Sequence, residues 1–131
     1  MQPVEDLTIA RQRSADPSAF RSAMGDMPGA VTVITSWACD GTPSGATLSA
    51  VVSLSLDPPL MLACFDHGSN TLSAIQSQGR FLVHVLAHGQ QQVALKFSGK
   101  SPDKFKDVEW DIGAFGLPKL DGCVVAVACE L

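Results

Sequence analysis

Residues 47–59 read TLSAVVSLSLDPP, and this segment decides most of the fold prediction. Side chains of a β-strand alternate between its two faces. Most odd positions here carry a hydroxyl, whereas the even positions are all apolar, namely Leu48, Ala50, Val52, Leu54 and Leu56. The alternation predicts one strand over 47–56 with its apolar face in a hydrophobic core. The prolines at 58 and 59 are expected to end it, because proline cannot donate to a strand ladder.

The hydroxyl-bearing face of this strand allows two interpretations. A solvent-exposed strand face usually carries long charged or amide side chains, and none occurs between 47 and 56. Small hydroxyls would also let a flat ligand approach the backbone and bond its polar edge. The face is therefore either a solvent face or part of a ligand site.

The flanking sequence predicts alternating strands and short helices around this segment. Upstream, residues 1–15 are polar and aperiodic and are expected to form a flexible tail; Asp16 and Pro17 begin a helix that ends at Pro28. A strand over 30–39 follows, with a turn at Asp40–Gly41. Downstream we expect strands over 60–65, 81–86 and 123–129, helices over 70–78 and 90–97, and a loop over 98–119. This order predicts one β-rich α+β domain, built as a barrel.

Composition narrows the class of protein. The 131 residues carry a net charge of -4, 46% hydrophobic residues and only 17% charged residues. This excludes a disordered chain and argues against a nucleic-acid partner, while the low charge favours a subunit interface or an apolar ligand site. No signal peptide or membrane-spanning stretch is visible, which predicts a cytoplasmic protein without a membrane partner. The four cysteines show no metal-ligand spacing and are interpreted as buried free thiols, with no metal site.

A second candidate site follows the strand over 60–65. Asp66, Ser69, Asn70 and Thr71 lead into a predicted helix, whose first N–H groups and dipole favour an anion. The same residues could be only a helix cap. Neither a nucleophilic triad nor a Gly-rich phosphate loop is present, and His84 lies within an apolar strand. A cofactor would then supply the chemistry.

Several blocks of the chain resemble the flavin reductase family, the FMN-binding split barrels that act as reductase components of two-component flavin monooxygenases. The blocks read FRSAM at 20–24, PGAVTVIT at 28–35, ATLSA at 46–50, SLSLDPPL at 53–60, CFDHGSNT at 64–71, GRFLVHVL at 79–86 and ALKF at 94–97. In order and spacing the resemblance covers about 20–131.

The resemblance implies a six-stranded split β-barrel with short flanking helices that forms a homodimer. It implies bound FAD or FMN, NADH or NADPH as the hydride donor, and a flavin-dependent monooxygenase that receives the reduced flavin. Hydride transfer is direct, so no catalytic side chain is implied. The implied cofactor contacts are Thr47, Leu48, Ser49, Ala50 and Ser53 beside the ring, Ser69, Asn70 and Thr71 near the phosphate, Lys96 and Phe97 in a further segment, and Asp66.

Two departures from the family keep other functions open. The family usually has Asn at the position of His84, and it continues past a segment like 123–131 with strands that carry a nicotinamide-binding His. We therefore expect the domain over 16–131 to be incomplete at its C-terminal end, lacking the last strands. The alternatives are a flavin-binding module without reductase activity, a structural or partner-binding β domain, and a barrel of the pyridoxamine-phosphate-oxidase type, against which the SLDPP run argues.

Overall fold

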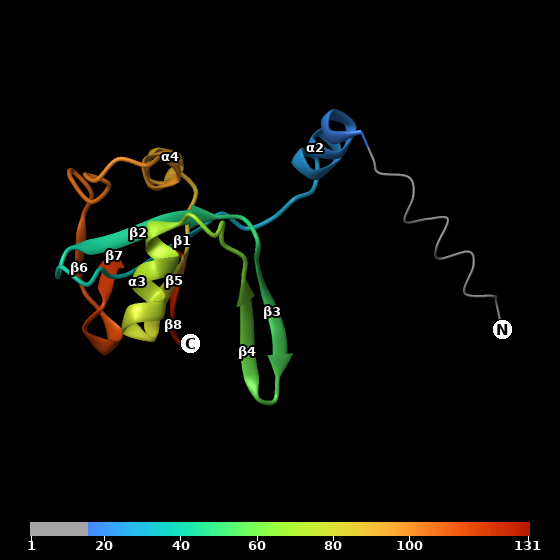
Figure 1. Ribbon diagram of the computed structural model, residues 1–131. Coiled ribbons are helices and arrows are strands. Elements are labelled where there is room, and N and C mark those ends of the chain that lie inside the picture. The colour runs from blue at the N-terminus through green and yellow to red at the C-terminus, as the bar shows by residue number, and fades with distance from the viewer. Residues whose placement is uncertain (1–15) are drawn as a thin grey trace.

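The computed structural model describes residues 16–131, and the tail expected at 1–15 lies outside the described residues. A four-stranded antiparallel sheet forms the centre, with strand order β2-β1-β5-β8. Its strands are β1 (Thr32–Trp37), β2 (Pro43–Leu48), β5 (Arg80–Val85) and β8 (Val125–Glu130). Since β2 and β8 each pair with one neighbour, they form the two edges of this sheet (Figure 1).

Both faces of the central sheet are covered. Helix α3 (Asn70–Gln78) packs on one face, where Ile75 meets Ile34, Leu48 and Val83 in a buried cluster. Helix α4 (Gln91–Ser98) and the short hairpin of β6 (Trp110–Ile112) and β7 (Pro118–Leu120) pack on the other. There Val33, Phe97 and Leu120 form the second buried cluster. The α+β prediction is thus confirmed.

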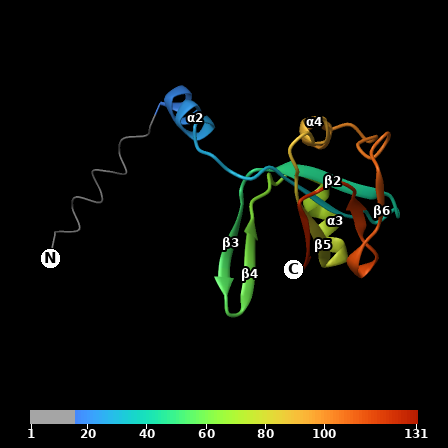
Figure 2. The same ribbon diagram turned by 180° about the vertical axis from the view of Figure 1, so that it is seen from behind.

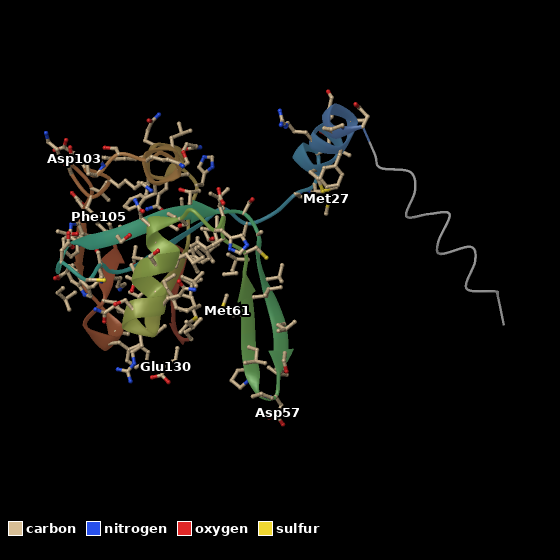
Figure 3. The ribbon with its side chains drawn as sticks, viewed as in Figure 1. Met27, Asp57, Met61, Asp103, Phe105 and Glu130 are labelled. Carbon is tan, nitrogen blue, oxygen red and sulfur yellow. The ribbon has the colours of Figure 1, made fainter. Side chains whose placement is uncertain are left out.

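The strand predicted over 47–56 is wrong as one continuous element. Strand β2 ends at Leu48, and β3 (Val51–Leu56) begins after a break at Ser49 and Ala50. Strand β3 pairs only with β4 (Pro59–Ala63), with Asp57 at the tip of this hairpin (Figure 3). Both ribbon views show the hairpin extending away from the central sheet (Figures 1 and 2).

Because of this break, most side chains of the predicted apolar face are not buried. Leu48 is buried, but Val52, Leu54 and Leu56 are 54%, 60% and 92% exposed. The residue types keep alternating in the sequence of β3, but the pairing with β4 shifts register between Ser53 and Ser55. No layer of the described residues covers these apolar side chains, because the strand has left the central sheet. The expectation that all five even positions enter a core of this chain is therefore wrong.

The predicted helix starts are confirmed. Helix α2 (Pro17–Gly25) begins at Asp16, whose carboxylate accepts the Ala19 N–H at 2.9 Å, although it ends earlier than expected. Helix α3 begins at Ser69 and ends at Gly79, which adopts a left-handed φ of 72°. No residue of α2 is buried, and the helix stands apart from the sheet (Figures 1 and 2).

Two further predictions need correction. The loop expected over 98–119 contains β6, β7 and a 3-10 turn at Ala114–Gly116, because three-residue strands are too short to show a period. The four cysteines are free, but none is buried: Cys39 and Cys64 are exposed. The described strands form sheets of four, two and two strands and do not close into a barrel. No helix of the described residues is long and apolar enough to cross a membrane.

Candidate functional site

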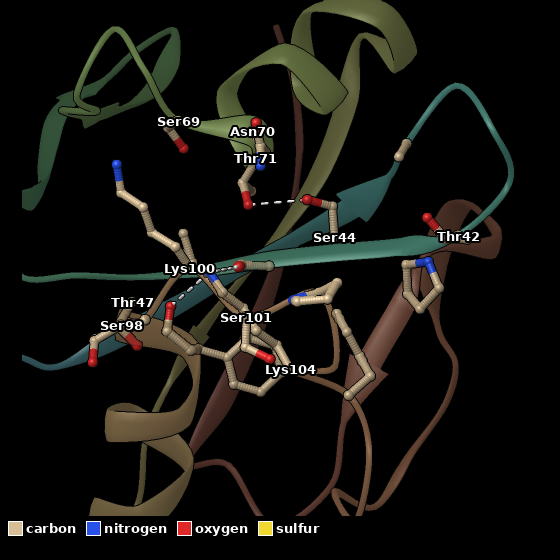
Figure 4. A pocket seen from close by; sticks show the side chains of 18 of the residues that line it. Thr42, Ser44, Thr47, Ser69, Asn70, Thr71, Ser98, Lys100, Ser101 and Lys104 are labelled. Carbon is tan, nitrogen blue, oxygen red and sulfur yellow. Dashed lines mark hydrogen bonds between the residues drawn. The ribbon is translucent and has the colours of Figure 1, made fainter.

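A cavity of about 600 Å³ follows the outer edge of β2 (Figure 4). The start of α3 bounds it from one face of the sheet, and the end of α4 with the following loop bounds it from the other. The turn between β1 and β2 forms its far end. The polar side chains that line it are Asp40, Thr42, Ser44, Thr47, Asp66, Ser69, Asn70, Thr71, Ser98, Lys100, Ser101 and Lys104.

The unpaired edge of β2 gives this cavity backbone hydrogen-bonding groups. The Gly45 carbonyl accepts a bond from Lys104 Nζ at 2.9 Å, so it points away from the sheet. In an antiparallel pair, alternate residues direct both their N–H and C=O groups outward. Thr47 therefore presents its backbone groups on the same side as Gly45, whereas Pro43 presents only a carbonyl. A planar ligand with donors and acceptors on one edge can pair with such a strand.

Gly45 also lets the wall of the cavity approach the strand closely. A Cβ at this position would lie 2.7 Å from the Phe97 ring. Phe97 is fully buried and meets Phe105 edge-to-face at 4.9 Å between ring centroids. The absent side chain of Gly45 is therefore what allows the Phe97 ring to sit against β2.

The start of α3 supplies donors at the middle of the cavity. The first N–H groups of a helix lack intrahelical partners and carry the positive end of the helix dipole. The Ser69 hydroxyl accepts the Leu72 N–H at 3.3 Å, and the Asp66 carboxylate accepts the Gly68 N–H at 3.3 Å. The hydroxyls of Thr71 and Ser44 lie 3.0 Å apart, which ties the helix to the edge strand.

The two lysines of the cavity have different roles. Lys104 Nζ donates to the carbonyls of Gly45 and Phe97 at 2.9 and 3.1 Å, and burial lowers the pKa of its ammonium. It is engaged in joining β2 to α4. Lys100 is exposed, and its side chain extends toward Ser69 (Figure 4). Together with the α3 start it makes this part of the cavity attractive to an anion.

The cavity brings together six of the candidate residues from the sequence. These are Thr47, Asp66, Ser69, Asn70, Thr71 and Phe97. The other five lie outside its lining. Leu48 is buried in the core, Ser49 and Ala50 are exposed in the link after β2, and Ser53 is exposed on β3. Lys96 lines a second pocket between α4 and Val108.

Sequence reasoning missed the remaining polar lining. The sequence predicts Asp40 only as a turn residue. Ser98, Lys100, Ser101 and Lys104 lie in the segment predicted as a loop. Thr42 and Ser44 precede the row of hydroxyl side chains over 47–55 that predicts a ligand site. One available signal was the run of small residues over 42–47, which carries no long side chain and so resembles the row that follows it.

His84 is fully buried and does not line the cavity. Its Nδ1 donates to the Val33 carbonyl at 2.9 Å, and its Nε2 accepts the Leu120 N–H at 3.1 Å. Burial lowers the pKa of this imidazole, and the positive charge of Lys119 lowers it further. His84 therefore joins β1, β5 and β7 as a neutral side chain.

A family model described as "Flavin reductase like domain" matches residues 24–131. The flavin reductase (NADH) of Kitasatospora aureofaciens is 41% identical over 114 residues, which cover 86% of this chain and 60% of that protein. The reductase subunit HsaB of a flavin-dependent monooxygenase from Mycobacterium tuberculosis is 38% identical over 116 residues, covering 88% of this chain and 62% of the subunit. The chain thus spans about three-fifths of the length of these curated relatives.

Solved structures show the same arrangement of elements. The NADH:FAD oxidoreductase SgcE6 of Streptomyces globisporus C-1027, solved in complex with NAD and FAD fragments, superposes with a TM-score of 0.80 at 33% identity. The match covers 90% of this chain and 73% of that one. Nitrilotriacetate monooxygenase component B from Mycobacterium thermoresistibile gives a TM-score of 0.81 at 36% identity, covering 86% and 63% of the two chains.

Proposed function

This chain belongs to the flavin reductase-like domain family, and from that membership we propose that it is an NAD(P)H:flavin oxidoreductase. The protein uses NADH or NADPH to reduce FAD or FMN, and it supplies the reduced flavin to a partner flavin-dependent monooxygenase. Two relatives support this proposal, because one is named as an NADH flavin reductase and another as the reductase subunit of a monooxygenase.

The cavity along β2 is the observation that carries the proposal. Its volume of about 600 Å³ is in the range usual for cofactor sites, roughly 300–1,000 Å³. A flavin has a planar ring whose edge carries hydrogen-bond donors and acceptors, and a phosphate some distance away. The outward backbone groups of Thr47 match the ring edge, since Lys104 already occupies the carbonyl of buried Gly45. The α3 start and Lys100 match the phosphate. The donor set therefore fits a flavin.

We place the ring at the Thr47 end of the cavity and the phosphate at the α3 start. Leu48, Ser49, Ala50 and Ser53 follow Thr47 along the chain, and Ser49 and Ala50 are exposed there, so a ring can extend onto them. Phe97 is buried against Gly45 and supports this part of the cavity from behind. Asp66 holds the turn that precedes α3. Lys96 lines the second pocket beside α4 and lies outside the cavity.

When bound, the flavin supplies the hydride-accepting chemistry, so no side chain has to act as a general acid or base. The contribution of the chain is then binding and orientation. Thr47 is held in place by its hydroxyl, which donates to the Ala94 carbonyl at 2.6 Å. Lys104 fixes the distance between β2 and α4. These bonds would limit the orientations open to a bound flavin ring.

We also propose a homodimer, a six-stranded split barrel and a cytoplasmic location. The exposed apolar side chains of the β3–β4 hairpin support the dimer, since monomers rarely expose such patches. The four strands of the central sheet together with β3 and β4 would make the six strands of the barrel. The free state of Cys39, Cys64, Cys123 and Cys129 is compatible with a reducing compartment.

Flavin binding and NADH oxidation test the function. We expect FAD or FMN to bind with a change in flavin fluorescence, and NADH or NADPH to be consumed only when flavin is added. Replacing Lys100 with Met should weaken binding about fivefold, the value of an exposed ion pair of about 1 kcal/mol. The matched change Lys106→Met removes an exposed charge that does not line the cavity, and it should have no effect.

Each contrary result has a defined meaning. Absence of flavin binding would contradict the proposed function. Binding without nucleotide oxidation would replace it with a flavin-binding module that lacks reductase activity. Equal effects of the two lysine substitutions on flavin affinity would contradict the proposed position of the phosphate at the start of α3.

A further inference from the structure

The cavity continues beyond the start of α3 to the turn between β1 and β2. Ser44 marks its middle, because its hydroxyl lies 3.0 Å from that of Thr71. A strand rises about 3.3 Å per residue. Thr47 is therefore about 10 Å from Ser44 in one direction, and Thr42 is about 7 Å away in the other. Both ends belong to one cavity.

A flavin mononucleotide placed as proposed would not reach the far end of this cavity. If the ring lies at Thr47 and the phosphate at the α3 start, FMN ends near Ser44. The part of the cavity lined by Asp40, Thr42 and Pro43 would then have no ligand group in it. A flavin dinucleotide continues from that phosphate through a second phosphate to a ribose and an adenine.

The β1–β2 turn holds a carboxylate at this far end. Asp40 Oδ1 accepts the Thr42 N–H at 3.0 Å and the Thr42 hydroxyl at 2.6 Å. These two bonds hold the pKa of Asp40 below its ordinary value, so the group is ionised at neutral pH. The second carboxylate oxygen, Oδ2, makes no hydrogen bond within the described residues.

The turn itself is fixed at both ends. The Ala38 N–H donates to the Thr42 carbonyl at 2.9 Å, and the Gly41 N–H donates to the Ala38 carbonyl at 3.0 Å. Gly41 has a φ of 82°, a left-handed conformation that glycine adopts without strain. Asp40 is exposed to solvent, but its bonds with Thr42 hold the carboxylate in one orientation at the mouth of the cavity.

We infer that Asp40, with Thr42 and the apolar ring of Pro43, forms a subsite for the adenylate ribose, which makes FAD the preferred flavin. This inference rests on the proposed function. An ionised carboxylate accepts hydrogen bonds from the vicinal hydroxyls of a ribose, the chemistry that acidic residues perform in dinucleotide sites of other folds. FMN lacks this ribose and gains nothing from Asp40.

An adenylate ribose also occurs in NADH, so the source of the ribose has to be distinguished. The subsite lies in the same cavity as the α3 start, directly beyond the position proposed for the flavin phosphate. Continuity with that phosphate assigns the ribose to FAD. A nicotinamide nucleotide bound at this place would instead exclude FAD from the Asp40 end.

Titrations of the whole chain with FAD, FMN and NAD⁺ test the subsite. We expect the unmodified protein to bind FAD at least tenfold more tightly than FMN. Asp40→Asn keeps an oxygen that can accept the Thr42 bonds, so the turn should persist. It removes the negative charge, and we expect it to weaken FAD binding five- to tenfold while FMN binding changes less than twofold. The matched change Glu109→Gln, outside the cavity, should alter neither.

Three outcomes would overturn the inference. Equal affinities of the unmodified protein for FAD and FMN contradict it, as does an FAD preference that Asp40→Asn leaves intact. Weaker NAD⁺ binding in Asp40→Asn, with FAD binding unchanged, assigns the ribose to the nicotinamide nucleotide. Failure to bind either flavin contradicts the proposed function, whereas the first three outcomes leave flavin binding itself in place.

Discussion

The backbone N–H of Leu120 donates a hydrogen bond of 3.1 Å to Nε2 of His84, in the buried layer between β5 and β7. Since Nδ1 already donates to the Val33 carbonyl, this second bond requires an unprotonated Nε2. A protonated ring would place an N–H group against another N–H group. The imidazole is therefore held neutral by geometry as well as by burial.

This arrangement predicts a loss of stability in acid. The pKa of His84 is lowered from its ordinary value of 6.5 in the folded chain, so below pH 6.5 the unfolded chain takes up a proton that the folded chain does not. The free energy of unfolding should fall as pH drops below 6.5, by at most about 1.4 kcal/mol per pH unit for one proton, and level off below the folded pKa. Urea unfolding at several pH values between 8 and 5 measures it.

The control for this prediction is His84→Gln, which removes the titrating ring. This variant should be less stable at every pH, because it disturbs bonds to Val33 and Leu120. Its stability should nevertheless depend less on pH between 6.5 and 5 than that of the unmodified chain. An unchanged slope in the variant would show that other groups cause the acid sensitivity.

Gly45→Ala should destabilise the fold and disturb the cavity. The new Cβ would lie 2.7 Å from the Phe97 ring and 3.4 Å from the Ile34 carbonyl oxygen, and neither group can withdraw easily. Overpacking of this kind costs about 1–3 kcal/mol. Gly68 lines the same cavity, but a Cβ added there would have no atom within 4 Å. Gly68→Ala should therefore change the free energy of unfolding by less than about 0.5 kcal/mol. Denaturant unfolding of both variants separates the two effects.

Local signals in the sequence predicted those elements whose ends are set by short-range chemistry. Helix α3 is the clearest case, because Ser69 caps its start and Gly79 supplies the left-handed residue at its end. The sequence predicts an anion site at Ser69, Asn70 and Thr71, and the structure places these residues in the lining of the cavity. Ser44, whose hydroxyl lies 3.0 Å from that of Thr71, carries no such local signal.

The remaining parts depend on long-range contacts that no local pattern contains. The alternation of apolar residues continues in the sequence across Ser49 and Ala50. No local signal therefore indicates that the chain leaves the central sheet at this point. The charged run over 103–107 is typical of a solvated loop. Lys104 nevertheless turns inward, because the carbonyls of Gly45 and Phe97, distant in sequence, meet there.

Ser49→Leu tests where the flavin ring lies. Ser49 is exposed in the link between β2 and β3, so a larger side chain there should leave the fold and its unfolding free energy nearly unchanged. If the ring extends from Thr47 onto this link, the leucine blocks it, and we expect flavin affinity to fall at least tenfold. Fluorescence titration measures this. Unchanged affinity would contradict the placement of the ring beside Ser49.

Leu54→Glu should weaken the proposed homodimer. Leu54 is 60% exposed at the register shift between Ser53 and Ser55 of β3. Val52 and Leu56 nearby are also exposed, and a dimer would cover these apolar side chains. A charge buried in that interface is costly, so we expect the dimer dissociation constant to rise at least tenfold, or by about 1.4 kcal/mol. Leu95→Glu on α4, where Leu95 is 64% exposed, is the matched control and should leave the mass unchanged. Light scattering at micromolar concentration measures the mass of both variants and of the unmodified chain. A monomeric mass for the unmodified chain would refute the dimer, since the apolar side chains of the hairpin would then be stable without a partner.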